Sequence, residues 1–226
     1  MTRVKLCGIT SEEDAGLCAE AGADALGFVV EYPLPVPWSI DRRQAAALMR
    51  GLPPFVVRVA VVGGDAATIL AITELTEAHV VQLHLDEDEA TVTAVREGLA
   101  GTGTRIVKAI RIDVQSEERG PVAGWRAVSR RFLDAGADAI LLDSKTAGRP
   151  AGTGKPVDWS LAAEVAAGLG APLVLAGGLT PANVAAAIDE VRPYGVDVIS
   201  SVEDAAHRKS PERVRAFIAA VRAAEA

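Results

Sequence analysis

Cysteine, histidine and aromatic residues are scarce in this chain, and long apolar runs are lacking. Two cysteines, Cys7 and Cys18, among 226 residues exclude a module stapled by several disulfides. The three histidines, His79, His84 and His207, do not have the spacing of zinc ligands. No apolar run reaches the ~18 residues of a membrane span, and the N-terminus lacks a signal-peptide pattern. We therefore expect a cytoplasmic protein without membrane association or a bound metal.

A concentration of basic charge is also missing. The 23 Lys and Arg residues are scattered and are outnumbered by 30 Asp and Glu, giving a net charge of −7. Nucleic-acid binding usually requires a basic patch or stripe, so we expect no nucleic-acid partner. The chain is 50% hydrophobic and 23% charged, with glycine and proline spread along its length. This composition predicts one folded domain over residues 1–226.

Short runs of Val, Ile and Leu alternate with Ala-rich helical patterns from one end of the chain to the other. Such alternation is typical of βα units around a parallel sheet, and continuous apolar runs fit strands that are buried on both faces. We expect eight strands, at residues 3–7, 24–30, 56–62, 79–84, 105–110, 138–143, 172–176 and 195–200.

An internal repeat supports the count of eight. AGADAL at 21–26 recurs as AGADAI at 135–140, about half a chain later. Four units in each half fit an α/β fold of the single (β/α)8 barrel type better than an open doubly wound sheet of five or six strands.

Three helix starts can be predicted from capping patterns. Thr10 with Glu13 resembles a capping box, and Thr180-Pro181 and Ser210-Pro211 place a hydroxyl before a proline.

In such a barrel the chemistry lies at the carboxyl ends of the strands. The first strand ends in Cys7-Gly8, where the thiol is either a rim group or a buried apolar side chain, as we expect for Cys18. The sixth strand ends in Asp143, a carboxylate that either faces the rim pocket or caps a turn. A thiol and a carboxyl across one pocket could act as base and acid without a metal.

Three loops near this rim could contact a ligand, and two of them contain glycines. Gly177-Gly178 and the stretch 200–203, with Ser200 and Ser201, follow the last two strands, where barrels commonly bind phosphate. The GTGK run at 152–155 lacks the spacing of a P-loop, and is either a flexible loop over the pocket or an ordinary surface turn.

Taken together and in order, several segments resemble the phosphoribosylanthranilate isomerase family or a close paralogue. The family fold is the (β/α)8 barrel. The segments are LCGIT (6–10), AGADALGFV (21–29), VQLH (81–84), LLDS (141–144), GTGK to VDW (152–159), LAGGLTPANV (175–184) and GVDVISSVE (195–203).

The resemblance implies a cofactor-free Amadori rearrangement of N-(5′-phosphoribosyl)anthranilate in tryptophan biosynthesis. It implies that Asp143 is the general acid and Cys7 the general base. The implied phosphate-binding residues are Gly177, Gly178, Ser200 and Ser201. The predicted substrate-binding residues are Gly8, Trp38, Gln82, His84, Gly152 and Gly154.

Several positions depart from the family pattern. Where the family usually has Ser-Pro-Arg, with the arginine meeting the anthranilate carboxylate, this chain has Val-Pro-Trp at 36–38. Losing a partner for a desolvated carboxylate can cost roughly 2–5 kcal/mol. Arg42 and Arg43 lie nearby in the sequence, but we expect them on a helix. Leu85 and Ser201 replace usual glycines, and Gly63 or Gly64 replaces an asparagine.

These departures leave other functions open. A paralogue could isomerise a different aminosugar phosphate whose aryl group lacks the carboxylate. A non-catalytic barrel could bind a sugar phosphate or serve as an assembly partner. The sequence also leaves open whether the chain is a monomer or a homodimer, because apolar helix faces can pack on the barrel or on a second subunit.

Overall fold

The computed structural model describes residues 1–113, 121–145 and 157–224, with only the backbone at position 145. Its strands form one parallel sheet. They are β1 (Arg3–Cys7), β2 (Ala25–Val30), β3 (Ser39–Ile40), β4 (Val57–Val62), β5 (Val80–Leu83), β6 (Arg105–Asp113), β7 (Ala139–Lys145), β8 (Leu173–Leu175) and β9 (Gly195–Val198).

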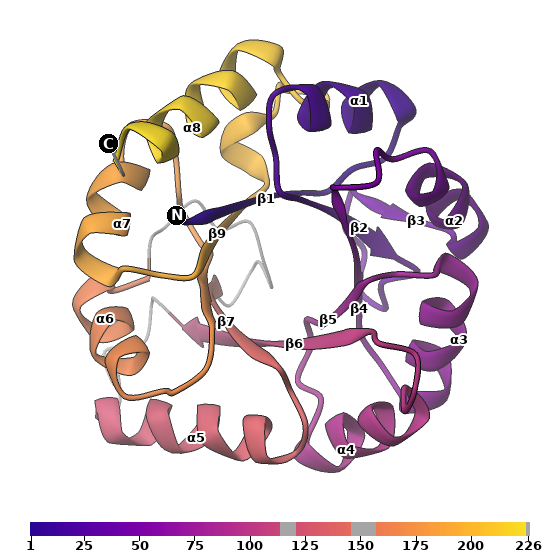
Figure 1. Cartoon of the computed structure of the whole chain (residues 1–226), viewed down its shortest axis with the longest axis vertical. Helices are drawn as coiled ribbons and strands as arrows, with labels where there is room; N and C mark the ends of the chain where they lie inside the picture. Colours follow the sequence, from indigo (N-terminus) through magenta and orange to yellow (C-terminus); the bar gives the residue numbers. More distant parts are fainter. Residues whose placement is uncertain (114–120, 146–156, 225–226) are drawn as a thin grey trace.

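The sheet closes into a barrel. Strands pair in the order β1-β9-β8-β7-β6-β5-β4-β2, and β1 pairs with β2 to complete the ring, whereas the short β3 pairs only with β2. Figure 1 looks down this ring, with the helices arranged around it. Among the described residues the barrel thus has eight strands, and each of the eight expected strands overlaps one of them. The predicted (β/α)8 fold is confirmed.

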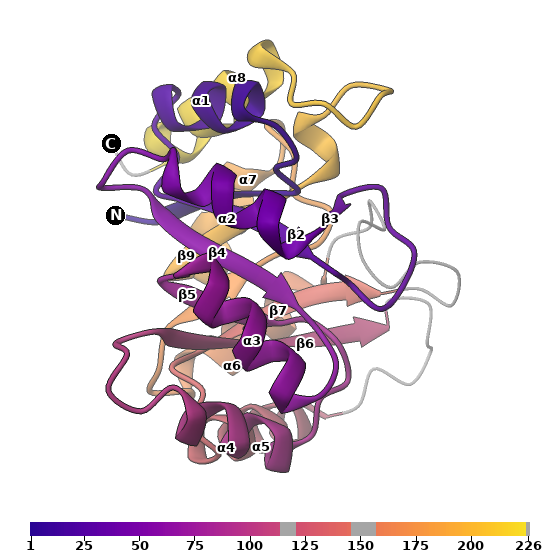
Figure 2. The same cartoon turned by 90° about the vertical axis from the view of Figure 1, so that its right-hand side faces the viewer.

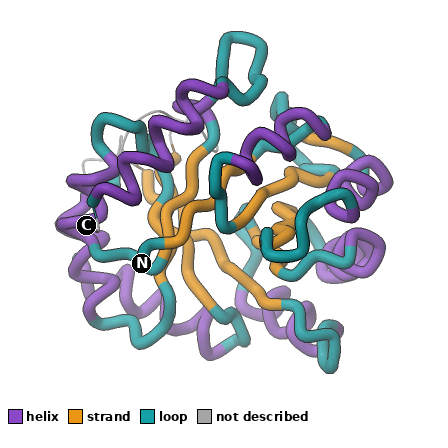
Figure 3. Tube along the Cα trace, turned by 45° about the horizontal axis from the view of Figure 1, so that its top comes forward, coloured by secondary structure: helices purple, strands orange, loops and turns teal. Residues whose placement is uncertain are grey.

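Helices form the outer layer, which Figure 3 shows surrounding the strands. They are α1 (Glu12–Glu20), α2 (Arg42–Arg50), α3 (Ala66–Thr76), α4 (Glu89–Gly98), α5 (Val122–Asp134), α6 (Trp159–Ala167), α7 (Val184–Val191) and α8 (Pro211–Ala223), with a 3₁₀ turn, η1 (Ser200–Val202).

Side chains alternate between the two faces of the barrel wall. In β1, Val4 and Leu6 pack into the large core shared with the helices, whereas Cys7 belongs to a smaller apolar cluster with Val29 and Val61. Since successive side chains of a strand point to opposite faces, Lys5 shares the inner face with Cys7. The arrows of β4, β6 and β7 point to the same side of the molecule in Figure 2, and the site lies at that side.

Two of the predicted helix starts were wrong and one is confirmed. The cap of α1 is Ser11, whose hydroxyl accepts from the Asp14 backbone N–H, so the helix starts one residue later than a Thr10 cap requires. Thr180-Pro181 lies in a turn, because Asn183 bonds back to the Thr180 N–H and α7 begins only at Val184. Ser210 caps α8, with proline in its first turn.

The last strand was predicted too long. It ends at Val198, and Ser200 begins the 3₁₀ turn η1. None of the helices within the described ranges is long and apolar enough to cross a membrane.

Candidate active site

A cavity opens at the carboxyl end of the barrel, where the ends of several strands converge. It brings together residues that are far apart in the sequence. Its lining residues are Cys7, Val29, Tyr32, Val36, Trp38, Val61, Gln82, His84, Asp143, Ala176, Gly177, Gly178, Leu179, Asp197, Val198, Ile199 and Ser200.

The Cys7 thiol is buried at the end of β1 and stands beside an ion pair. Lys5, two residues earlier on the same face, places its Nζ 2.7 Å from Asp197 Oδ2, and both side chains are buried. Burial raises the pKa of the Cys7 thiol, and the Lys5 ammonium opposes that rise. Although burial disfavours a charged amine, Asp197 and Cys7 raise the pKa of Lys5. Lys5 is therefore a buried cation next to a sulfur atom.

Asp143 occupies the end of β7 and is held in place by two neighbours. Its Oδ1 accepts from the Ser144 backbone N–H at 2.7 Å, and its Oδ2 lies 3.3 Å from Nε2 of His84. Gln82 Nε2 lies 2.9 Å from Nδ1 of the same histidine. Because an amide nitrogen can only donate, Nδ1 accepts and the proton of a neutral His84 sits on Nε2, facing Asp143.

The two glycines after β8 lie beside Asp143. Gly177 and Gly178 have φ angles of +81° and +63°, which favour glycine. A Cβ at Gly177 would lie 2.6 Å from the Ser144 hydroxyl and 3.0 Å from Asp143 Oδ1. Both glycines and Ser200 line the cavity, so their backbone is available to a ligand.

Ser201 is placed differently from its neighbour Ser200. It does not line the cavity, and its hydroxyl donates to the Leu179 carbonyl at 2.6 Å. Its side chain therefore fastens η1 to the preceding loop. Gly152 and Gly154 of the GTGK run lie outside the described residues.

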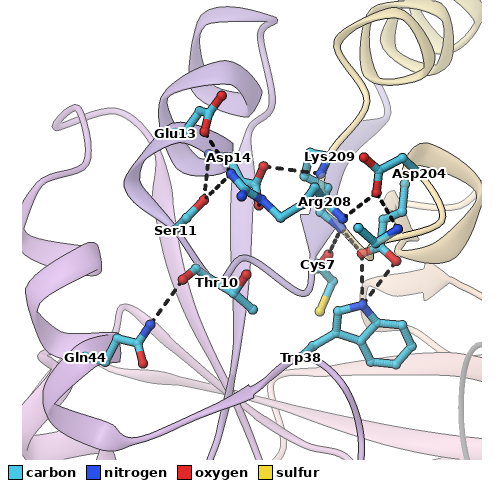
Figure 4. Close-up of polar contacts among 12 residues, drawn as sticks. Cys7, Thr10, Ser11, Glu13, Asp14, Trp38, Gln44, Asp204, Arg208 and Lys209 are labelled. Atoms are coloured by element: carbon cyan, nitrogen blue, oxygen red, sulfur yellow. Dashed lines mark hydrogen bonds and ion pairs between the residues drawn. The ribbon is translucent and has the colours of Figure 1, made fainter.

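Trp38 is fixed by a buried carboxylate. Its indole N–H donates to both carboxylate oxygens of Glu203, at 2.9 and 3.1 Å. Lys209 Nζ donates to Glu203 Oε1 at 2.6 Å and to the Cys7 carbonyl at 2.6 Å. In Figure 4 the Cys7 sulfur points toward Trp38, and Lys209 lies above both in this view. Gly8 lies under the indole, because a Cβ there would come within 2.8 Å of the ring.

The described lining residues include no lysine or arginine. As expected, Arg42 lies on α2, where its guanidinium binds Glu31, and Arg43 lies on the same helix. Leu85, which replaces a usual glycine, packs against Gly63. A Cβ at position 63 would lie 2.3 Å from Leu85 Cδ1, so the leucine fills the space that the glycine leaves.

Several lining or flanking residues were not predicted from the sequence, among them Tyr32, Val36, Lys5 and Asp197. Tyr32 donates its hydroxyl to the His84 carbonyl at 2.7 Å, and burial raises the pKa of this phenol. Val36 adds apolar surface. Lys5 and Asp197 could have been noticed as charged residues inside apolar strands, with Lys5 on the same face as Cys7. No group of three or more potential metal ligands occurs in the part of the chain that the structure describes.

Comparison with known proteins identifies the family of this chain. Residues 4–220 match the family described as N-(5′-phosphoribosyl)anthranilate (PRA) isomerase. The N-(5′-phosphoribosyl)anthranilate isomerase of Pseudomonas putida strain W619 is 41% identical over 223 residues, which cover 98% of each chain.

Solved structures of PRA isomerases have the same fold. The Thermotoga maritima enzyme has a TM-score of 0.80 and 36% identity, covering 99% of this chain and 100% of that one. A PRA isomerase in complex with reduced 1-(o-carboxyphenylamino)-1-deoxyribulose 5-phosphate has a TM-score of 0.77 and 34% identity, with the same coverage. The resemblance seen in the sequence motifs is confirmed, and the chain belongs to the N-(5′-phosphoribosyl)anthranilate isomerase family.

Proposed function

We propose that this chain converts N-(5′-phosphoribosyl)anthranilate to 1-(2-carboxyphenylamino)-1-deoxyribulose 5-phosphate, an aldose-to-ketose rearrangement of tryptophan biosynthesis. The observation that carries the proposal is that Cys7 and Asp143, from β1 and β7, line one cavity together with the glycine loop after β8. Family membership supports the same reaction. No cofactor takes part in this proposal.

The proposed reaction needs one acid and one base. Asp143 protonates the ring oxygen of the ribose, which opens the ring to a Schiff base between C1′ and the aryl nitrogen. The Cys7 thiolate then removes the proton from C2′, giving an enolamine. Protonation at C1′ and formation of the C2′ carbonyl complete the rearrangement. The His84 Nε2–H, 3.3 Å from Oδ2, orients the acid toward the substrate.

The phosphate group is proposed to bind at the loops after β8 and β9. Gly177 and Gly178 adopt left-handed backbone and have no Cβ, so a phosphate could approach their peptide N–H groups closely. Ser200, in the loop after β9, lines the same cavity. Ser201 supports this site indirectly, through its bond to the Leu179 carbonyl.

Turnover of freshly prepared substrate tests the proposal, together with rescue of a tryptophan auxotroph that lacks this isomerase. We expect turnover by the wild type, and a loss of at least ~100-fold in kcat for Cys7→Ser and for Asp143→Asn. Thr91→Ala, in the first turn of α4 and not among the residues that line the cavity, is the matched control and should keep the wild-type rate. Absence of turnover by folded wild type would reject the activity, whereas near-normal rates in both variants would reject the assigned roles.

One observation favours a second candidate, an isomerase for an aryl aminosugar phosphate without the carboxylate. The Trp38 N–H is already taken by Glu203, and the described lining holds no Arg or Lys for an aryl carboxylate. Comparing kcat/KM for the anthranilate and aniline phosphoribosides decides between them. A large preference for anthranilate supports the first candidate, and equal or better use of aniline supports the second.

A further inference from the structure

We propose that Lys5, anchored by Asp197 inside the barrel, is a positioning residue that stabilises the thiolate form of Cys7. The inference rests on the proposed function, in which Cys7 acts as the base. It concerns a buried cation that the rearrangement itself does not require. The pair joins β1 to β9, which are neighbouring strands in the barrel wall.

The geometry places the ammonium and the sulfur side by side. Cys7 pairs with Gly27 of β2, and a Cβ at Gly27 would lie 2.6 Å from Cys7 Sγ and 3.0 Å from Lys5 Nζ. Both atoms therefore crowd the same point next to the glycine Cα. The missing side chain at Gly27 provides the space in which the sulfur and the amine meet.

Asp197 keeps Lys5 at this position. Its Oδ2 accepts from Lys5 Nζ at 2.7 Å, and both residues are buried. Its other oxygen, Oδ1, is buried without a partner among the described residues. A buried carboxylate with one strong partner favours the charged ammonium, which in turn favours a negative sulfur beside it.

Other charged groups near Cys7 come from several elements. The charge of Asp197 on β9 disfavours the Cys7 thiolate, whereas the charge of Lys209 favours it. Lys209 already donates to Glu203 and to the Cys7 carbonyl. On β2, the residue paired with Cys7 is the uncharged Gly27. His84 and Asp143 face the cavity from the other side. Among these groups, Lys5 has the largest effect in favour of the thiolate.

The test is a titration of the Cys7 thiol by thiolate absorbance, in a Cys18→Ala background and with the Cys7→Ser spectrum subtracted. We expect Lys5→Met to raise the thiol pKa by about one pH unit or more. Asp197→Asn keeps an acceptor for Lys5 while removing the negative charge, so it should leave the pKa unchanged or lower it. A structural disturbance would instead move both variants in the same direction.

Activity provides the second measurement. We expect kcat/KM of Lys5→Met to fall about 10-fold or more at neutral pH and to recover as the pH rises, because more of the thiol then ionises. An unchanged thiol pKa and a loss of rate that does not depend on pH would overturn the proposal. If the wild type turns over no substrate, the function fails while the titration still stands.

A double variant guards against misfolding. Lys5→Met/Asp197→Asn removes both buried charges and avoids leaving an unpaired carboxylate. Its thiol pKa should still exceed that of the wild type, because Lys5 acts on the thiol more strongly than Asp197 does. The matched control is Lys108→Met/Glu87→Gln, which removes a buried pair elsewhere in the barrel wall. Equal thiol pKa shifts in the two double variants would contradict the inference.

Discussion

Lys5–Asp197 and Lys108–Glu87 are buried ion pairs of nearly equal length, 2.7 and 2.8 Å. Their surroundings differ. Lys5 lies on the inner face of the barrel next to Cys7, whereas Lys108 lies 5.3 Å from the ring centroid of Phe132 on α5. Lys108 also donates to the Leu85 carbonyl, and Glu87 accepts from the Leu85 N–H, so both partners are used to hold that loop.

The pKa values of the two lysines are also shifted in opposite directions. Asp197 and Cys7 raise the pKa of Lys5 in spite of burial, whereas burial lowers the pKa of Lys108 in spite of Glu87. Besides the Asp197 carboxylate, the group that raises the pKa of Lys5 is the Cys7 thiol, which becomes negative when it ionises. The two pairs differ in what they contact: Lys5–Asp197 adjoins the Cys7 thiol, whereas Lys108–Glu87 holds a loop and lies against a helix. We expect the first pair to matter for the chemistry proposed for Cys7 and the second for stability.

The largest expected effect is on stability, at the outer pair. Lys108→Met leaves the Glu87 carboxylate buried without its cation, and should lower the free energy of unfolding by about 3–5 kcal/mol. Urea denaturation measures this change. Arg131→Met breaks the exposed Arg131–Glu89 pair and is the control, with an expected loss of about 1 kcal/mol or less. Equal losses would mean that burial does not distinguish the two pairs.

A smaller effect is expected on activity, at the inner pair. Gly27→Ala inserts a Cβ where Cys7 Sγ and Lys5 Nζ meet, and the resulting displacement should reduce kcat/KM about 10- to 100-fold. Gly16→Ala in α1, where a Cβ meets nothing within 4 Å, should keep the rate and add about 0.5–1 kcal/mol of stability. A Gly27→Ala enzyme with normal kinetics would argue against a tightly built Cys7 environment.

The smallest expected effect compares the two thiols. Burial raises the pKa of Cys18 to about 12. The unfolded chain ionises this thiol near its ordinary pKa of 9.0, so the stability that a neutral buried thiol contributes is present below pH 9 and is lost as the pH rises toward 12. Relative to Cys18→Ala, the wild type should lose about 1 kcal/mol between pH 8 and pH 10. Urea denaturation at both pH values measures this difference. Parallel pH profiles of the two proteins would contradict it.

The barrel could be predicted because its signals are local. Each strand is a short apolar run, and the repeat of AGADAL gives the spacing of the units. Cys7 and Asp143 could be picked out as polar groups that end such runs, at the edge where parallel strands converge. The cap at Ser11 was missed by one residue because Thr10 and Ser11 offer the same hydroxyl chemistry, and only the fold selects between them.

The contacts that could not be predicted join distant segments. The bond from Trp38 to Glu203 and the pair of Lys5 with Asp197 each link opposite ends of the chain, and ring closure alone brings them together. Composition also gives no indication that Gly27 leaves space for the Cys7 sulfur. This space can be recognised only once the register of β1 and β2 is known, because Cys7 pairs with Gly27.

The proposed role of Cys7 as the base can be tested with substrate that carries deuterium at C2′. In a single turnover, the wild type should release this deuterium to water as the ketose forms. Cys7→Ser should release it at least ~100-fold more slowly, while its affinity for inorganic phosphate at the glycine loops stays the same. Release at the wild-type rate from a folded Cys7→Ser variant would show that another group removes the proton.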